Sequence, residues 1–281
     1  MKRKYLSLGL LALTVGVLVG CSNGSEKTAE STTKNSGEAT AASSSKESTA
    51  STKSEDSSTQ NSTQLSSSST ETTPADQAEQ VLSELATLFP GHALPNSILT
   101  GTTKNYISAA TTSAGDQTNF NILYYAEDQP IKVNSTELNE LKPIAAMEKI
   151  TFASDEEAKS EVGKIEDYSG SEVDLGYGLT GYMQGAAGSS YLTWAEGNWN
   201  VTIKASNIDG EDPVKLGKEV VMHLEENMLP VPEQDGNIQL EVGENGDYQT
   251  NSVVWQKKNI VYKIHHFNAI QVVKMATSTN G

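Results

Sequence analysis

The sequence predicts an α+β fold: antiparallel sheet strands arranged in meander-plus-helix units, preceded by a disordered Ser/Thr-rich linker. Ile238, Leu240 and Val242 alternate with polar residues, which is typical of a half-buried strand. Residues 74–89 place their apolar side chains at helical spacing. Residues 22–75 are rich in Ser and Thr and nearly free of large apolar residues, so they cannot bury enough surface to offset chain entropy.

The helices are predicted from their N-terminal signals. Thr73 stands before a proline, which suits the first helical position. Ser154 and Glu157 have the spacing of a capping box, and Asp212 is a good cap in front of another proline. We expect helices over 74–89, from 154, from 212 and over 269–276.

The strands are predicted from alternation and from turn signals. We expect them at 104–111, 118–126, 180–184, 190–195, 199–205, 238–242, 251–256 and 260–265. Asn245-Gly246 is the strongest short hairpin signal in the chain. The segments from Trp194 and from Trp255 have the same pattern of a tryptophan, a turn and an alternating strand. Either a meander-plus-helix unit is duplicated, or two unrelated hairpins obey the same rule.

The N-terminus has the pattern of a signal peptide. Lys2, Arg3 and Lys4 form a positive region, followed by the apolar stretch 6–19. This stretch is shorter than the roughly 20 apolar residues that span a membrane. Cys21, the only cysteine of the sequence, follows directly, so an intramolecular disulfide is excluded.

Leu18-Val19-Gly20-Cys21 resembles the lipobox of bacterial lipoproteins. The resemblance implies that the Cys21 sulfur carries a diacylglycerol and that the signal peptide is cut between Gly20 and Cys21. It also implies a lipid-anchored protein on the extracytoplasmic face of the cell membrane, as in a Gram-positive bacterium. The alternative is an ordinary signal peptide with an incidental cysteine.

The chain is therefore expected to contain a signal peptide at 1–20, a lipidated cysteine and linker at 21–75, and an extracellular domain at 76–281 with a possible sub-boundary near 170. The basic N-terminus offsets the acidic linker, so the formal charge of −16 resides on the domain. Such a charge argues against nucleic acid as a partner, because nucleic-acid sites are basic. The partners that we expect are the membrane, through the lipid, and a component of the cell wall or an envelope protein.

No pattern for a catalytic site, a cofactor or a metal stands out. His92, His223, His265 and His266 lack metal-ligand spacing, and the last two point to opposite faces of a strand. Residues 207–212 contain oxygen ligands but lack the spacing of a calcium loop. We therefore predict no catalytic residue, no cofactor and no metal site.

Aromatic residues on the predicted strands leave two interpretations open. Trp194, Trp199 and Trp255 either pack in the core, which we favour, or line a groove for a sugar or peptide. The C-terminal segment 254–276 resembles the ends of uncharacterised domain families in lipoproteins of Gram-positive bacteria. Those families have no assigned catalytic residues, so the resemblance implies a fold style and no chemistry.

These observations predict a non-enzymatic binding or interaction module held outside the membrane. The competing class is a hydrolase that acts on the cell wall, because paired carboxylates cannot be placed in space from sequence. Neither the ligand nor the oligomeric state follows from the sequence.

Overall fold

The computed structural model describes residues 72–280 except 113–115, 165 and 245. The described residues belong to one compact unit, Ser66–Gly281. The predicted signal peptide, Cys21 and nearly all of the predicted linker lie outside the described residues. The sheet, its helices and the candidate sites all belong to this unit.

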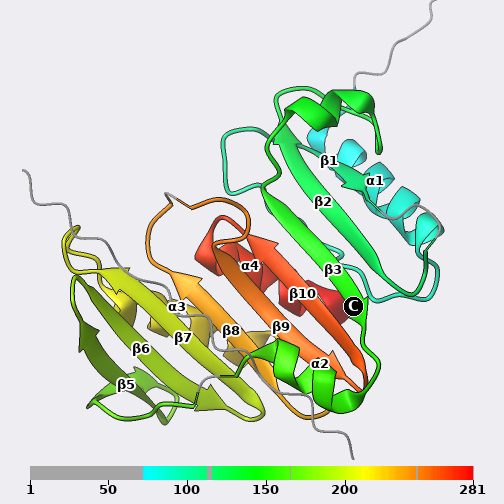
Figure 1. The fold of residues 1–281 in the computed structure, drawn as a ribbon. Coiled ribbons are helices and arrows are strands. Elements are labelled where there is room, and N and C mark those ends of the chain that lie inside the picture. Colours follow the sequence, from blue (N-terminus) through cyan, green and yellow to red (C-terminus); the bar gives the residue numbers. More distant parts are fainter. Residues whose placement is uncertain (1–71, 113–115, 165, 245, 281) are drawn as a thin grey trace, which may run out of the picture. The chain divides into compact units, whose positions relative to one another are not determined.

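The described strands form one ten-stranded sheet in the order β1-β2-β3-β10-β9-β8-β7-β6-β5-β4 (Figure 1). All neighbouring pairs are antiparallel except β7 and β8, which are parallel. The predicted α+β class with an antiparallel sheet is therefore confirmed. The strands are β1 Tyr106–Thr111, β2 Phe120–Glu127, β3 Ala145–Thr151, β4 Ser171–Gly176, β5 Leu179–Ala186, β6 Ser189–Glu196, β7 Trp199–Ser206, β8 Gly236–Glu241, β9 Asn251–Lys257 and β10 Ile260–His266.

Helices cover both faces of the sheet. The α-helices of the described part are α1 Pro74–Leu88, α2 Asp155–Val162, α3 Pro213–Glu226 and α4 Ala269–Thr277. Helices α1, α3 and α4 share the main core with the sheet, for example through Val81, Val221 and Val272. Helix α2 packs on the opposite face through Ala158 and Val162, against β9 and β10 (Figure 1).

The predicted helix caps are present. The Thr73 hydroxyl accepts from the backbone N–H of Asp76, and the Asp76 carboxylate accepts from Thr73 in return, which completes a capping box. Ser154 caps α2, and Asp212 caps α3. Each cap satisfies an N–H group that a helix start otherwise leaves unpaired.

The two tryptophan-bearing hairpins also form as predicted. Glu196 pairs with Trp199 and Lys257 pairs with Ile260, so each turn contains two residues. The first turn residue has a positive φ in both, 59° at Gly197 and 54° at Lys258. Such φ values are characteristic of the turns whose twist matches antiparallel strands.

The hairpin signalled by Asn245-Gly246 forms, because β8 and β9 pair antiparallel, but its connection is longer than a two-residue turn. Strand β8 ends at Glu241 and β9 begins at Asn251, so the connection runs over 242–250. Asn251 explains part of this arrangement, because its side chain accepts from the backbone N–H of Glu241 at 2.8 Å and so joins the two strands at the loop's base. Asn245 itself lies outside the described residues.

Candidate functional site

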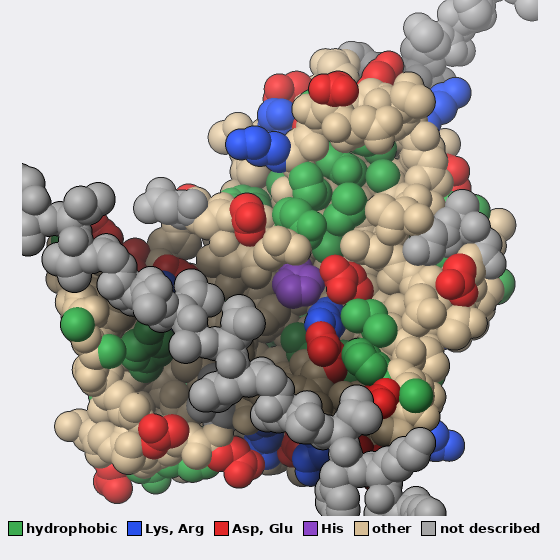
Figure 2. All heavy atoms as spheres, viewed as in Figure 1, with side chains coloured by type: hydrophobic (Ala, Val, Ile, Leu, Met, Phe, Trp, Pro, Cys, Tyr) green, Lys and Arg blue, Asp and Glu red, His purple; other side chains and the backbone are tan. Residues whose placement is uncertain are grey.

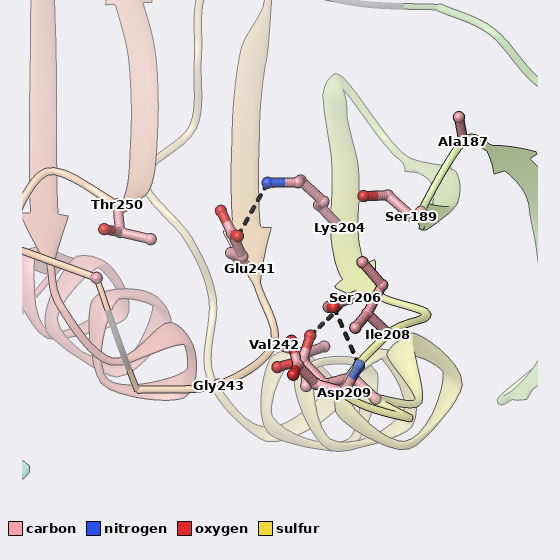
Figure 3. Close-up of a pocket in the computed structure, with 13 residues that line it drawn as sticks. Ala187, Ser189, Lys204, Ser206, Ile208, Asp209, Glu241, Val242, Gly243 and Thr250 are labelled. Atoms are coloured by element: carbon pink, nitrogen blue, oxygen red, sulfur yellow. Dashed lines mark hydrogen bonds and ion pairs between the residues drawn. The ribbon is translucent and has the colours of Figure 1, made fainter. Parts of the chain in front are cut away.

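The parallel pair β7 and β8 positions the first candidate site. Helix α3 connects the two strands, so both carboxyl ends lie at the same edge of the sheet. In open sheets with parallel strands, ligands bind at this edge. A cleft of about 510 Å³ opens there, and we call it the β7–β8 cleft (Figure 3). Its walls come from the β5–β6 turn, the end of β7, the β7–α3 loop, and the end of β8 with the loop after it.

One ion pair crosses the floor of the β7–β8 cleft. Lys204 and Glu241 are partners in the parallel register, and Nζ lies 2.9 Å from Oε1 (Figure 3). The hydrogen bond to Glu241 raises the pKa of Lys204, so the ammonium group of Lys204 is charged at neutral pH. The side chains are 42% and 44% exposed, and such pairs contribute little to stability. A ligand that separates Lys204 from Glu241 would therefore cost the protein little folding stability.

A second carboxylate holds the loop between β7 and α3. Glu211 accepts from the backbone N–H of Ser206 at 2.6 Å, and the Ser206 hydroxyl accepts from the N–H of Asp209 at 3.2 Å. Gly243 approaches from the other wall with a φ of 103°, and a Cβ there would lie 2.8 Å from Glu211 Oε1. The positive φ of Gly243 favours glycine, and this backbone conformation brings the β8–β9 loop against the Glu211 carboxylate.

The lining groups are suited to binding a polar ligand. Three carboxylates and one ammonium surround the cleft, with the hydroxyls of Ser189, Ser206 and Thr250 between them. Within the described lining, no histidine accompanies these hydroxyls, so none has an imidazole as a general base. The arrangement can donate and accept hydrogen bonds, but it contains no nucleophile–base pair of that kind.

A second groove opens at the opposite end of β7, and we call it the Trp199 groove. It encloses about 420 Å³ between the β6–β7 turn, the last turn of α3 and the segment 228–232. Trp199, Leu224, Leu229, Pro230 and Pro232 give it apolar walls, and Glu196 adds one carboxylate. Apolar pockets of this size with few polar groups are typical of small-molecule sites.

The three tryptophans named from the sequence occupy different places. Trp194 is fully buried and Trp255 is 2% exposed, and both belong to the main core. Trp199 is 7% exposed and packs near Trp255, with ring centroids 6.5 Å apart. Of the three, Trp199 alone lines one of the described grooves. Trp199 therefore packs in the core and also lines the groove.

The four histidines do not form a cluster, although His265 and His266 are neighbours on β10. His92 packs against Phe120, His223 bonds Thr277, and His266 bonds the carbonyl of Leu99. His265 points to the opposite sheet face from His266 and lies near the charges of Glu148, Lys263 and Asp247. On the face of the molecule drawn in Figure 2, a histidine lies beside acidic and basic side chains. Burial lowers the pKa of all four, to about 4 for His266. Among the described residues, no group of three or more His, Cys, Asp and Glu side chains is arranged to hold a metal ion.

Comparisons with protein-family models, with curated proteins and with solved structures gave no match for this chain. No helix among the described residues has the length and apolar character needed to span a membrane. The fold and the two sites therefore carry the functional argument by themselves.

The sequence pointed to only one part of the β7–β8 cleft, the stretch 207–212, whose Asp209 and Glu211 line it. Lys204 and Glu241 occupy ordinary polar positions of strands and were not predicted as site residues. A usable signal was the order strand, helix, strand over 199–241, which permits a parallel pair and so places two strand ends together. Glu196 was missed for a similar reason, because only the fold brings it beside the end of α3.

Proposed function

We propose that this protein is a lipid-anchored binding module on the extracytoplasmic face of the cell membrane, with the β7–β8 cleft as its ligand site. Its ligand is a polar component of the cell wall or of an envelope protein. The lipobox-like segment ending at Cys21 supports the anchor, and the Ser/Thr-rich linker supports a tether. Two acyl chains on a cysteine give stable anchoring.

The observation that carries the binding role is the composition of the β7–β8 cleft. Lys204, Glu241 and Glu211 come from separate segments and converge on one cleft of about 510 Å³. Charged groups of both signs beside hydroxyls match a ligand that carries hydroxyl, amino and carboxyl groups, as cell-wall glycans and their peptides do. A hydrolase would need an acid or nucleophile that is activated by its surroundings.

Co-sedimentation with purified peptidoglycan tests this proposal. The polypeptide Ser22–Gly281 avoids lipidation and keeps the whole folded unit. We expect the wild-type polypeptide to pellet with peptidoglycan, and Lys204→Gln and Glu241→Gln to reduce the bound fraction about tenfold, as expected when charged hydrogen bonds are lost. Lys218→Gln, on the exposed side of α3, is the matched control and should bind like the wild type.

Equal binding by all four proteins would show that the cleft is not the site. No binding by any of them would remove peptidoglycan as the ligand. Release of soluble fragments would favour the alternative function, a cell-wall hydrolase.

A further inference from the structure

The Trp199 groove contains a carboxylate that no described group neutralises. Glu196 is the last residue of β6 and pairs with Trp199 across the turn. Its Oε2 is buried and has no hydrogen-bond partner, and Glu196 takes part in none of the ion pairs of the described part. The Trp194 indole N–H lies near this carboxyl but outside hydrogen-bonding geometry, so Nε1 is unpaired as well. A buried acceptor without a partner costs stability unless a ligand supplies a donor.

The surroundings of Glu196 increase that cost. Burial raises the pKa of Glu196, the Trp194 indole opposes the rise, and the charge of Glu225 adds to it. The groove also lies at the carbonyl end of α3, where the helix dipole is negative. His223 in the last turn has a lowered pKa and is neutral at pH 7, so it does not compensate. The charge of Glu225 and the negative end of the helix dipole both favour a cation beside this carboxylate.

Most of the remaining lining is apolar, and Asn198 and Asn227 are its polar members. Trp199, Leu224 and Leu229 form one continuous side with the segment after α3. Pro230 and Pro232 are buried and restrict the backbone of this segment, while Val231 between them is 76% exposed at the rim. The groove is therefore preformed, with one charged end and an apolar body.

We propose that the Trp199 groove binds a primary alkylammonium group. The methylene chain packs against Trp199 and Leu229, and the ammonium donates hydrogen bonds to Glu196. An ammonium has three donors and no acceptor, which fits a carboxylate that lacks a donor. The net charge of −16 adds a general attraction for cations. Free alkylamines and lysine side chains share this chemistry.

Titration of the polypeptide Ser22–Gly281, followed by NMR of the tryptophan indole N–H groups, tests the proposal. The probes are n-hexylammonium, 1-hexanol of the same chain length and N-acetyl-lysine amide. We expect hexylammonium to shift the Trp199 signal and to bind about tenfold more tightly than hexanol, because a charged hydrogen bond is added. Binding of N-acetyl-lysine amide as well would assign the site to lysine side chains, and hexylammonium alone would assign it to free amines.

Two variants test the role of the carboxylate. Glu196→Gln keeps the shape and should weaken hexylammonium binding about tenfold while leaving hexanol binding unchanged. Val231→Arg alters only an exposed rim position and should weaken hexylammonium binding, because the arginine and the ammonium repel each other. Glu219→Gln, an exposed acid of α3 outside the groove, is the matched control.

Equal affinity for hexylammonium and hexanol, or no change in Glu196→Gln, would overturn the proposal. Absence of binding by both amine probes would overturn it too. Lys204→Gln should leave hexylammonium binding unchanged, because the β7–β8 cleft is at the other end of the strand. A negative result for amine binding in the Trp199 groove therefore leaves the proposed function of the β7–β8 cleft untouched.

Discussion

The indole ring of Trp199 lies directly over Gly236, its partner in the parallel register of β7 and β8. A Cβ on Gly236 would lie 2.6 Å from Cδ2 of the ring, closer than packed atoms approach. The contact fixes Trp199 between β8 and the groove that it lines.

We expect Gly236→Ala to destabilise the protein by about 1–3 kcal/mol, the usual cost of overpacking a filled core. Urea denaturation measures it. Gly185→Ala is the control, because a Cβ there meets nothing within 4 Å. Equal midpoints for the two variants would contradict the packing of Trp199 on Gly236.

Trp194 is a second test of the core. It is fully buried on β6, and truncation to Ala should cost about 3–5 kcal/mol. Thermal unfolding of Trp194→Ala should therefore show a midpoint far below that of the wild type. Met222→Ala, at a position that is 53% exposed, should barely change it. An unchanged midpoint for Trp194→Ala would favour the groove interpretation of this residue.

His266 makes stability depend on pH. Burial lowers its pKa to about 4 from an ordinary value of 6.5, so the unfolded chain takes up the proton first. The stability that it contributes is complete above pH 6.5 and is lost as the pH falls towards 4. From the size of the pKa shift, His266 contributes about 3 kcal/mol to the free energy of unfolding at pH 7.

Urea midpoints between pH 7 and pH 4 measure this dependence. His266→Gln should be less stable at pH 7, because the bonds to Leu99 and Asn268 are altered, and its midpoint should vary less with pH. His92→Gln is the comparison, since His92 is less buried and its pKa is lowered in the same direction. If the urea midpoints of His266→Gln and of the wild type change with pH in the same way, His266 does not cause the pH dependence of stability.

The anchor is tested by Cys21→Ser. We expect the variant to lose lipid and the lipoprotein-specific cleavage, because in the proposed anchor the Cys21 thiol is the group that takes the lipid. Membrane fractionation and the mass of the mature N-terminus report both effects. A variant that stays in the membrane with the signal peptide removed would disprove this form of anchoring.

Most strands and all the α-helices of the described part were predictable, because each has a local signal. The strands β3 and β4 were not. Strand β3 begins Ala145-Ala146-Met147 and lacks both alternation and β-branched residues at its start, and it is a strand because β2 and β10 pair with it on either side. Strand β4 does alternate, with Val173 and Leu175 inward and Glu172 and Asp174 exposed, but it is a six-residue edge strand made largely of residues that are rare in strands.

The sites were harder to predict than the fold. Trp199 could be named from its residue type, but its neighbours in the groove come from α3 and the segment after it. Lys204 and Glu241 are far apart in sequence and meet only because β7 and β8 are parallel, whereas the sequence favoured antiparallel meanders. Long-range pairing of this kind leaves no local pattern.

The most direct test of the central claim is chromatography of the soluble fraction after the polypeptide Ser22–Gly281 has been incubated with purified peptidoglycan. If the protein is a binding module, the peptidoglycan stays intact, and the profile of soluble fragments is identical to that of a sample without protein. Fragments that accumulate with time and with protein concentration would contradict the claim and identify a hydrolase.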